Sequence, residues 1–285
     1  MNKRVLSLLA ALVLLSITAA PALASCPVKG VYYNWDAYPG MAGDVATFGS
    51  NWYHTFRDYD GTSVLSLEQK FVPTRWCDLC GSYDGDWIDG TFGYDKPNWT
   101  WGPNPVDADD AAFYYYDYLQ EVAEARGQVL LAPTFYISHF GDVGNEVWLE
   151  IFYSILRSYG GEKPYGVAIS WEGCDPDQLF ADAEDVYHDD ATPGTWTEGA
   201  GVWLVELHIP KRANWDTYCS GAGNPSSPEA FMQQLFEQAK NHHFAAIATE
   251  VRTHLDWPTV EPLVNSSGAY TAMGTYFRTH TPSCS

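Results

Sequence analysis

One apolar run near the middle of the chain carries a carboxylate where chemistry could take place. Residues 201–210 read Gly-Val-Trp-Leu-Val-Glu-Leu-His-Ile-Pro, and Pro210 ends the run because proline cannot donate to a strand ladder. A strand this apolar is typical of a parallel sheet covered by helices. Parallel α/β barrels build their active sites at the carboxyl ends of such strands, where Glu206 lies. Glu206 is therefore a candidate nucleophile, and the alternative is a structural glutamate paired with a basic residue such as Lys211.

The elements expected around this run alternate between strand and helix. Strands are predicted at residues 28–35, 51–56, 69–76, 98–101, 128–137, 165–171, 201–207 and 244–251. Helices are predicted at residues 107–126, 146–159, 176–188 and 227–241, followed by a terminal helix or turn. This alternation indicates a parallel sheet, and about eight strands indicate closure. We therefore expect an α/β fold, a single and irregular (β/α)8 TIM barrel, with loops at residues 40–49 and 77–97.

The first residues have the features of an export signal. Lys3 and Arg4 precede an apolar stretch, and Ala22-Leu23-Ala24 supplies the small residues that a signal peptidase needs. We therefore expect a signal peptide over residues 1–24 and a secreted domain over residues 25–285. Residues 23–26 also fit a lipobox, which would anchor the chain through Cys26, but no other stretch is long and apolar enough to span a bilayer.

Charge and missing motifs narrow the classes of function. The formal net charge of −21 repels nucleic acid and anionic lipid and suits a neutral or cationic substrate. The chain lacks GxGxxG, GxxxxGK[ST], GxSxG and HExxH motifs. His242 and His243 read as favourable partners of a helix C-terminus rather than as metal ligands. We expect no metal, no organic cofactor and a monomeric chain.

Six cysteines in an exported chain indicate disulfides. A closed barrel would bring Cys26, before the first strand, near Cys284, after the last helix. Cys174 and Cys219 follow two successive strands, and a lone CxxC is a weak zinc or redox signal. We therefore predict the pairs Cys26–Cys284, Cys174–Cys219 and Cys77–Cys80. A lipidated Cys26 would leave an odd thiol, which argues against the lipobox.

Five short motifs occur in an order that resembles a known family. They are Tyr33-Asn34-Trp35, residues 71–76 (FVPTRW), residues 168–173 (AISWEG), Trp203-Leu204-Val205-Glu206 and residues 263–276 (LVNSSGAYTAMGTY). In this order they resemble the glycosyl hydrolase catalytic core, including glycoside hydrolase family 128, the secreted β-1,3-glucanases built on a TIM barrel. The resemblance covers nearly the whole predicted secreted domain and implies that Glu206 is the nucleophile.

Two departures from the family pattern concern the acid. The family carries its general acid in an Asn-Glu-Pro turn, where this chain has Trp101-Gly102-Pro103-Asn104-Pro105. The family's tyrosine after the strand at 165–171 is replaced by Glu172. Neighbouring strands lie about 4.8 Å apart, and a retaining glycosidase needs two carboxyl groups about 5–5.5 Å apart. We therefore predict that the acid has moved to Glu172; the alternative is a hydrogen-bonding or ion-pairing glutamate in a site with lost or altered activity.

The aromatic content, with 12 Trp and 19 Tyr, exceeds what a core normally needs and favours a saccharide partner. Asn34 and Asn104 are predicted to bind sugar hydroxyls. Stacking on sugar rings, or core packing instead, is expected of Trp35, Trp76, Trp101, Trp171 and Trp257. The sequence thus predicts a secreted glycoside hydrolase acting on a polysaccharide, above all a β-glucan. The alternatives are a non-catalytic carbohydrate-binding protein on a degenerate barrel and an acidic envelope protein whose aromatics form only its core.

Overall fold

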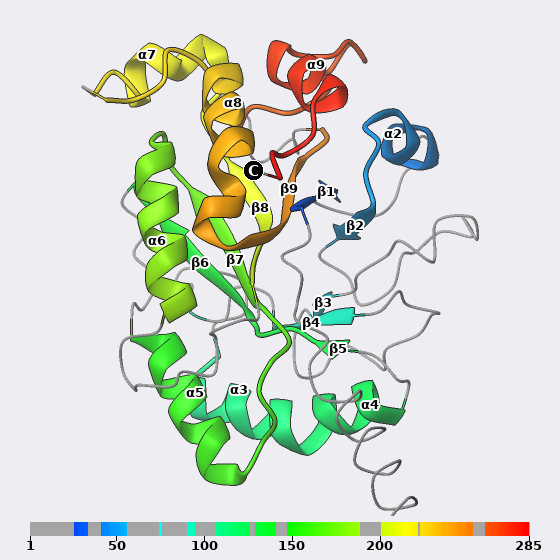
Figure 1. Cartoon of the computed structure of the whole chain (residues 1–285), viewed down its shortest axis with the longest axis vertical. Coiled ribbons are helices and arrows are strands. Elements are labelled where there is room, and N and C mark those ends of the chain that lie inside the picture. Colours follow the sequence, from blue (N-terminus) through cyan, green and yellow to red (C-terminus); the bar gives the residue numbers. More distant parts are fainter. Residues whose placement is uncertain are drawn as a thin grey trace, which may run out of the picture.

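The computed structural model describes residues 26–33, 41–55, 74–75, 90–94, 98, 106–125, 129–140, 147–188, 201–221, 223–252 and 260–284. Figure 1 shows these parts as ribbons, with helices packed around central strands. The predicted signal peptide and the predicted Cys77–Cys80 pair lie outside the described residues. Within the described part, none of the helices has the length and apolar character that crossing a bilayer requires.

The main sheet has six parallel strands in the order β2-β1-β9-β8-β7-β6. The first strand of the chain pairs with the last strand, β9, as expected when a parallel sheet curves toward a barrel. A second, three-stranded parallel sheet has the order β3-β4-β5. This arrangement confirms the predicted α/β fold class. The strands are β1 (Val28–Tyr33), β2 (Trp52–Thr55), β3 (Thr74–Arg75), β4 (Gly90–Tyr94), β5 (Val129–Leu130), β6 (Thr134–Ser138), β7 (Val167–Glu172), β8 (Val202–His208) and β9 (Phe244–Glu250).

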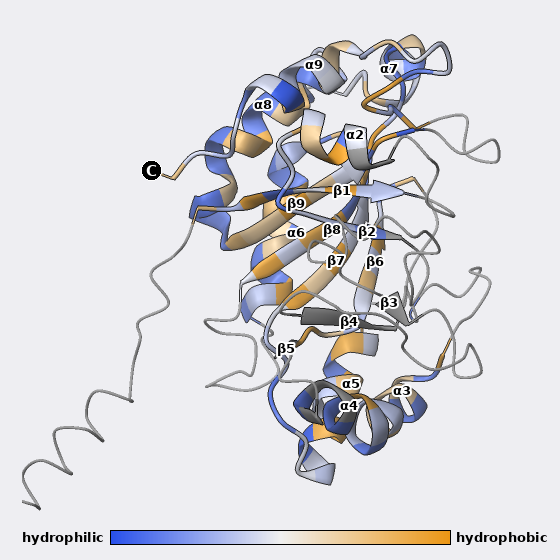
Figure 2. Ribbon diagram, turned by 90° about the vertical axis from the view of Figure 1, so that its right-hand side faces the viewer, coloured by the Kyte–Doolittle hydropathy of each residue, from blue (hydrophilic) through white to orange (hydrophobic). Residues whose placement is uncertain are grey.

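Helices cover one face of the main sheet. Figure 2 shows hydrophobic residues along β7 and β8, with helix α6 behind these strands. Helix α8 begins where the sequence predicts, because Ser227 accepts a hydrogen bond from the backbone N–H of Ala230. The helices are α2 (Met41–Thr47), α3 (Ala108–Tyr114), η2 (Tyr115–Leu119), α4 (Gln120–Ala125), α5 (Trp148–Tyr159), α6 (Pro176–His188), η3 (Arg212–Asn214), α7 (Trp215–Tyr218), α8 (Pro228–Gln238), η4 (Ala239–His242) and α9 (Ala272–Thr279).

The buried apolar residues form two clusters on opposite faces of the main sheet. The larger cluster lies between the sheet and its helices and includes Ile169 and Leu204. The smaller cluster lies on the inner face and contains Trp52, Ala168 and Val205 among its members. Side chains alternate between the two faces of a strand. The inner cluster therefore identifies the residues that point toward the interior of the barrel.

Two disulfides join segments that are distant in the sequence. Cys26 bonds to Cys284 and Cys174 bonds to Cys219, which confirms two of the three predicted pairs. Lys29 on β1 donates from its buried ammonium to the carbonyl oxygens of Phe277 and His280 at the end of α9. The two ends of the described chain are therefore fastened to each other.

Candidate active site

A β-bulge in β8 determines where Glu206 points. Leu204 pairs with Ile169 of β7, whereas Glu206 pairs with Ser170, so Val205 is an extra residue in β8. A bulge shifts the alternation of side chains by one position and often redirects a side chain next to a site. Without the bulge, Glu206 would share the helix-covered face with Leu204. With it, Glu206 joins Ser170 on the inner face of the sheet.

The carboxylate of Glu206 is enclosed by polar side chains from three strands. Ser170 donates to its Oε2 at 3.0 Å. The Nε2 atoms of His54 and His208 lie 3.7 Å from Oε1 and Oε2, respectively. Tyr32 stacks on the ring of His54 with 4.9 Å between ring centroids. The hydrogen bond from Ser170 and the close packing of the two imidazoles restrict the Glu206 carboxylate, and a nucleophile requires such a fixed geometry.

Glu172 lies on the adjacent strand and faces the same side. Its Oε2 accepts hydrogen bonds from the hydroxyls of Tyr136 at 2.7 Å and Ser138 at 3.1 Å, both on β6. Glu172 pairs in register with His208, two residues beyond Glu206. Strand spacing and rise place the two glutamate Cα atoms roughly 8 Å apart. Two side chains of this length that face one space can bring their carboxyl groups closer than their backbones.

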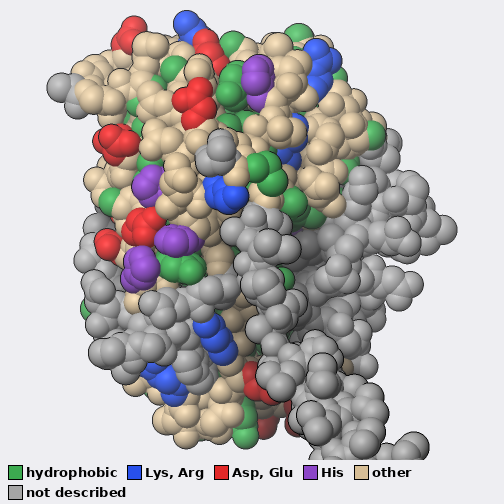
Figure 3. Space-filling model, viewed as in Figure 1, with side chains coloured by type: hydrophobic (Ala, Val, Ile, Leu, Met, Phe, Trp, Pro, Cys, Tyr) green, Lys and Arg blue, Asp and Glu red, His purple; other side chains and the backbone are tan. Residues whose placement is uncertain are grey.

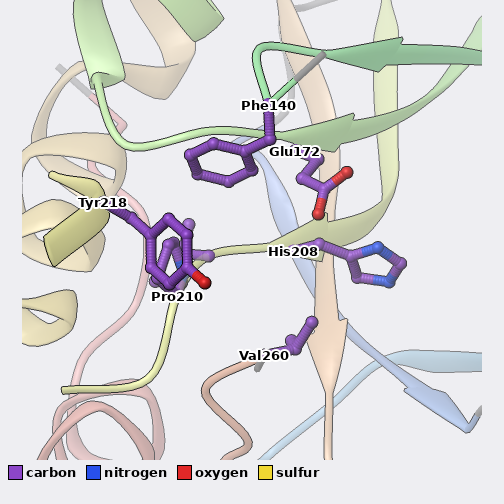
Figure 4. A pocket seen from close by; sticks show the side chains of 7 residues that line it. Phe140, Glu172, His208, Pro210, Tyr218 and Val260 are labelled. Carbon is purple, nitrogen blue, oxygen red and sulfur yellow. The ribbon is translucent and has the colours of Figure 1, made fainter. Parts of the chain in front are cut away.

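A pocket of about 150 Å³ opens at the carboxyl ends of β7 and β8. Figure 4 shows the side chains of Glu172 and His208 extending in the same direction from neighbouring strands, with the rings of Phe140 and Tyr218 on the opposite side. These two rings meet edge to face at 6.0 Å between centroids, and both are exposed. The pocket is thus lined by a carboxylate and by exposed aromatic rings, and a sugar has both polar edges and apolar faces.

Of the other residues predicted for sugar binding, the structure describes Trp171. Trp171 lies on the helix-covered face, where its indole N–H donates to Asp182 of α6 at 2.7 Å and its ring packs near Phe231 of α8. It is fully buried, so the predicted sugar-binding role of Trp171 is corrected to core packing. Outside the described residues lie Asn34, Trp35, Trp76, Trp101, Asn104 and Trp257.

Sequence reasoning missed several residues that surround the two glutamates. Most of them are polar side chains at inward positions of apolar strands. The sequence alone does not say which face of a strand is inward, so these positions could not be recognised. In β8 the bulge also breaks the alternation of inward and outward side chains. The missed residues are Tyr32, His54, Tyr136, Ser138, Ser170 and His208, with Phe140 and Tyr218 at the pocket.

A buried glutamate also ends β9. Glu250 pairs in register with Tyr32 of β1 and is 1% exposed. The sequence suggests an ion pair with Arg252, because residues two apart on a strand point the same way. The guanidinium of Arg252 instead lies 3.6 Å from Asp44 of α2. Glu250 is therefore a third carboxylate near the carboxyl ends of the central strands.

No family model matches the chain. Alkali-sensitive linkage protein 1 of Schizosaccharomyces pombe is 26% identical over 190 residues, which are 66% of this chain and 28% of that protein. The chain thus spans less than a third of the length of this curated relative.

Solved structures resemble nearly the whole chain. An exo-β-1,3-glucanase of GH128 subgroup VI from Aureobasidium namibiae superposes with a TM-score of 0.65 at 12% identity, covering 90% of this chain and 98% of that one. A subgroup V exo-β-1,3-glucanase from Cryptococcus neoformans gives 0.62 at 16%, covering 88% and 97%. A subgroup I endo-β-1,3-glucanase from Amycolatopsis mediterranei, bound to laminaripentaose, gives 0.61 at 18%, covering 88% and 98%. The chain therefore has the fold of the GH128 β-1,3-glucanases, as its ordered motifs predict.

Proposed function

We propose that the chain is a secreted glycoside hydrolase that cleaves a β-1,3-glucan, with Glu206 as nucleophile and Glu172 as acid/base. The observation that carries this proposal is the pair of glutamates on the inner face of adjacent strands, one of them lining a pocket with exposed aromatic rings. The fold shared with β-1,3-glucanases supports the choice of substrate. The two disulfides fit an extracellular protein.

The proposed reaction is a double displacement with retention of configuration. Glu206 attacks the anomeric carbon while Glu172 gives a proton to the departing glycosidic oxygen, so a glycosyl-enzyme ester forms and the leaving sugar departs as an alcohol. Glu172 then takes a proton from water, whose oxygen attacks the same carbon and releases Glu206. Ser170, His54 and His208 hold the nucleophile in place throughout.

The second candidate is a saccharide-binding protein without turnover. Glu206 has no exposed surface, and the Asn-Glu-Pro acid of the family pattern is absent from the sequence. A site that binds glucan through aromatic rings and hydroxyl groups needs neither an accessible nucleophile nor an acid. This candidate predicts binding that the replacement of either carboxylate leaves nearly unchanged.

Hydrolysis of laminarin separates the two candidates. The rate at which reducing ends are released should be at least about 10⁴-fold lower in Glu206→Gln than in the wild type, because the variant lacks the proposed nucleophile. Glu150→Gln, on the exposed side of α5, is the matched control and should keep the wild-type rate. Laminarin binding, followed by tryptophan fluorescence, checks that the variant still folds. Binding without turnover in the wild type would instead establish the second candidate.

A further inference from the structure

We propose that Glu184, His188 and His243 form a binding site for a divalent transition-metal ion such as Zn²⁺. One ligand atom from each of these three residues lies within 4.8 Å of the others. The His188 Nε2 and Glu184 Oε2 atoms are 3.2 Å apart, and the His243 Nε2 atom is 3.6 Å from the same oxygen. Figure 3 shows histidine and acidic side chains gathered over the α6 side of the molecule.

The spacing of these atoms is close to what the metal requires. In a tetrahedral site with bonds of about 2.0–2.1 Å, neighbouring ligand atoms lie roughly 3.3–3.4 Å apart. The two distances from Glu184 already fall near this value. The ligand atoms of His188 and His243 lie within 4.8 Å of each other, and a small rotation of the exposed His188 side chain can bring it to the spacing that the metal requires. Two imidazoles and one carboxylate form a ligand set that Zn²⁺ commonly takes, with a fourth position for water or another ligand.

Two elements hold the ligands in a prepared geometry. Glu184 and His188 are one turn apart on α6 and therefore share a helix face. His243 follows η4 with a φ of 63°, a left-handed conformation that a residue other than glycine adopts at a cost. The ring of Tyr187 stacks on His243 at 3.9 Å between centroids, which fixes the imidazole.

A fourth side chain stands next to the proposed ligands. The Nδ1 atom of His242 lies 3.1 Å from Glu184 Oε1, the carboxylate oxygen that faces away from His188 and His243. Phe180 stacks on this imidazole at 4.2 Å between centroids. His242 can therefore orient the carboxylate as metal-site neighbours usually do. Capping of a helix end requires neither the left-handed backbone of His243 nor the stacked rings beside Glu184.

The position of the cluster indicates a structural role. His243 immediately precedes β9, whereas the pocket with Glu172 lies at the carboxyl ends of the same parallel sheet. In barrels the end opposite the active site serves stability. A metal bound there would link the last turn of α6 to the turn that begins β9. A metal ion that binds the folded chain but not the unfolded chain would raise the thermal stability of the protein.

Zinc titration of the chain, made without a polyhistidine tag and dialysed against EDTA, tests the proposal. We expect one Zn²⁺ per chain by calorimetry and a rise in melting temperature with Zn²⁺ but not with Mg²⁺. His188→Ala and Glu184→Gln should each weaken the affinity by at least about tenfold, since loss of even a supporting residue has that effect. His280→Ala replaces an exposed histidine outside the cluster and should bind as the wild type does.

Three results would overturn the proposal. The first is a wild-type chain that shows no saturable Zn²⁺ binding. The second is unchanged affinity in both His188→Ala and Glu184→Gln. The third is an equal loss of affinity in His280→Ala, which would place the metal elsewhere. His188 is exposed, so its replacement should leave folding intact, and a circular dichroism melt without metal checks this.

Discussion

Glu172 is held by two hydroxyls from β6 on one carboxylate oxygen, which prepares it for a role at a fixed position. If it is the acid, Glu172→Gln should slow the hydrolysis of laminarin by ~10²–10⁴-fold, the usual contribution of a positioned proton donor. An aryl β-glucoside with an acidic phenol needs no protonation of its leaving group. The formation of the glycosyl-enzyme from that substrate should therefore be nearly unaffected, as a pre-steady-state burst of phenol would show.

Glu250 provides the competing assignment for the same role. It is another buried carboxylate near these strand ends, on the strand that neighbours β8. Glu250→Gln should not show the dependence on leaving group that is expected of Glu172→Gln. If the dependence appears in Glu250→Gln alone, the acid is Glu250 and the assignment of Glu172 is wrong.

The sequence singles out the two glutamates as candidates but not their neighbours, for a physical reason. A carboxylate at the end of an apolar strand stands out by composition, so Glu206 and Glu172 could be chosen without coordinates. The face on which a polar side chain lies depends on the register, and the bulge at Val205 reverses that register within β8. The sequence therefore does not distinguish His208 from its neighbours in the strand, although its imidazole lies beside the Glu206 carboxylate.

At the scale of elements, Asp182 of α6 ties the helix to two strands. Its Oδ2 accepts from the indole of Trp171 on β7 and lies 2.7 Å from Nε2 of His139, which follows β6. The hydrogen bond that His139 donates to Asp182 raises the pKa of His139; burial partly opposes this rise, and the charges of Asp182 and Asp175 add to it. A raised pKa means that the folded state binds the proton more tightly than the unfolded state does.

This contact should make part of the stability depend on pH. The contribution of His139 is fully present below its unfolded pKa of about 6.5. It is lost as the pH rises through the higher folded value. Because the pair is partly exposed, solvent screening limits it to about 1 kcal/mol or less. His139→Ala should therefore cost more stability at pH 5.5 than at pH 8.5 in urea unfolding, and an equal cost at both values would contradict this.

Most elements could be predicted because hydrophobic periodicity determines them, and the exceptions have local causes. The predicted strand at residues 128–137 is divided into β5 and β6 around Pro133, which lacks the N–H that a continuous ladder needs. Helix α2 and strand β4 lie within the predicted loops at residues 40–49 and 77–97, where neither segment has a clear period. Tertiary pairing determines such short elements.

At the scale of the whole molecule, the Cys26–Cys284 bond closes a loop of 258 residues, compared with 45 for Cys174–Cys219. Chain entropy predicts that the longer loop stabilises the fold more, by about 1.5 kcal/mol. The double variant Cys26→Ser/Cys284→Ser should therefore lose more stability in urea than Cys174→Ser/Cys219→Ser. A larger loss of stability in Cys174→Ser/Cys219→Ser would contradict this prediction.

As the proposed nucleophile, Glu206 should form a covalent bond to the sugar during hydrolysis. An activated 2-deoxy-2-fluoro-β-laminaribioside should trap this ester, because the fluorine slows its breakdown more than its formation. Mass spectrometry of the digested protein is predicted to find the added disaccharide on the peptide that contains Glu206, and no label in Glu206→Gln. Label on another carboxylate, or no label on a wild-type chain that hydrolyses laminarin, would contradict the account.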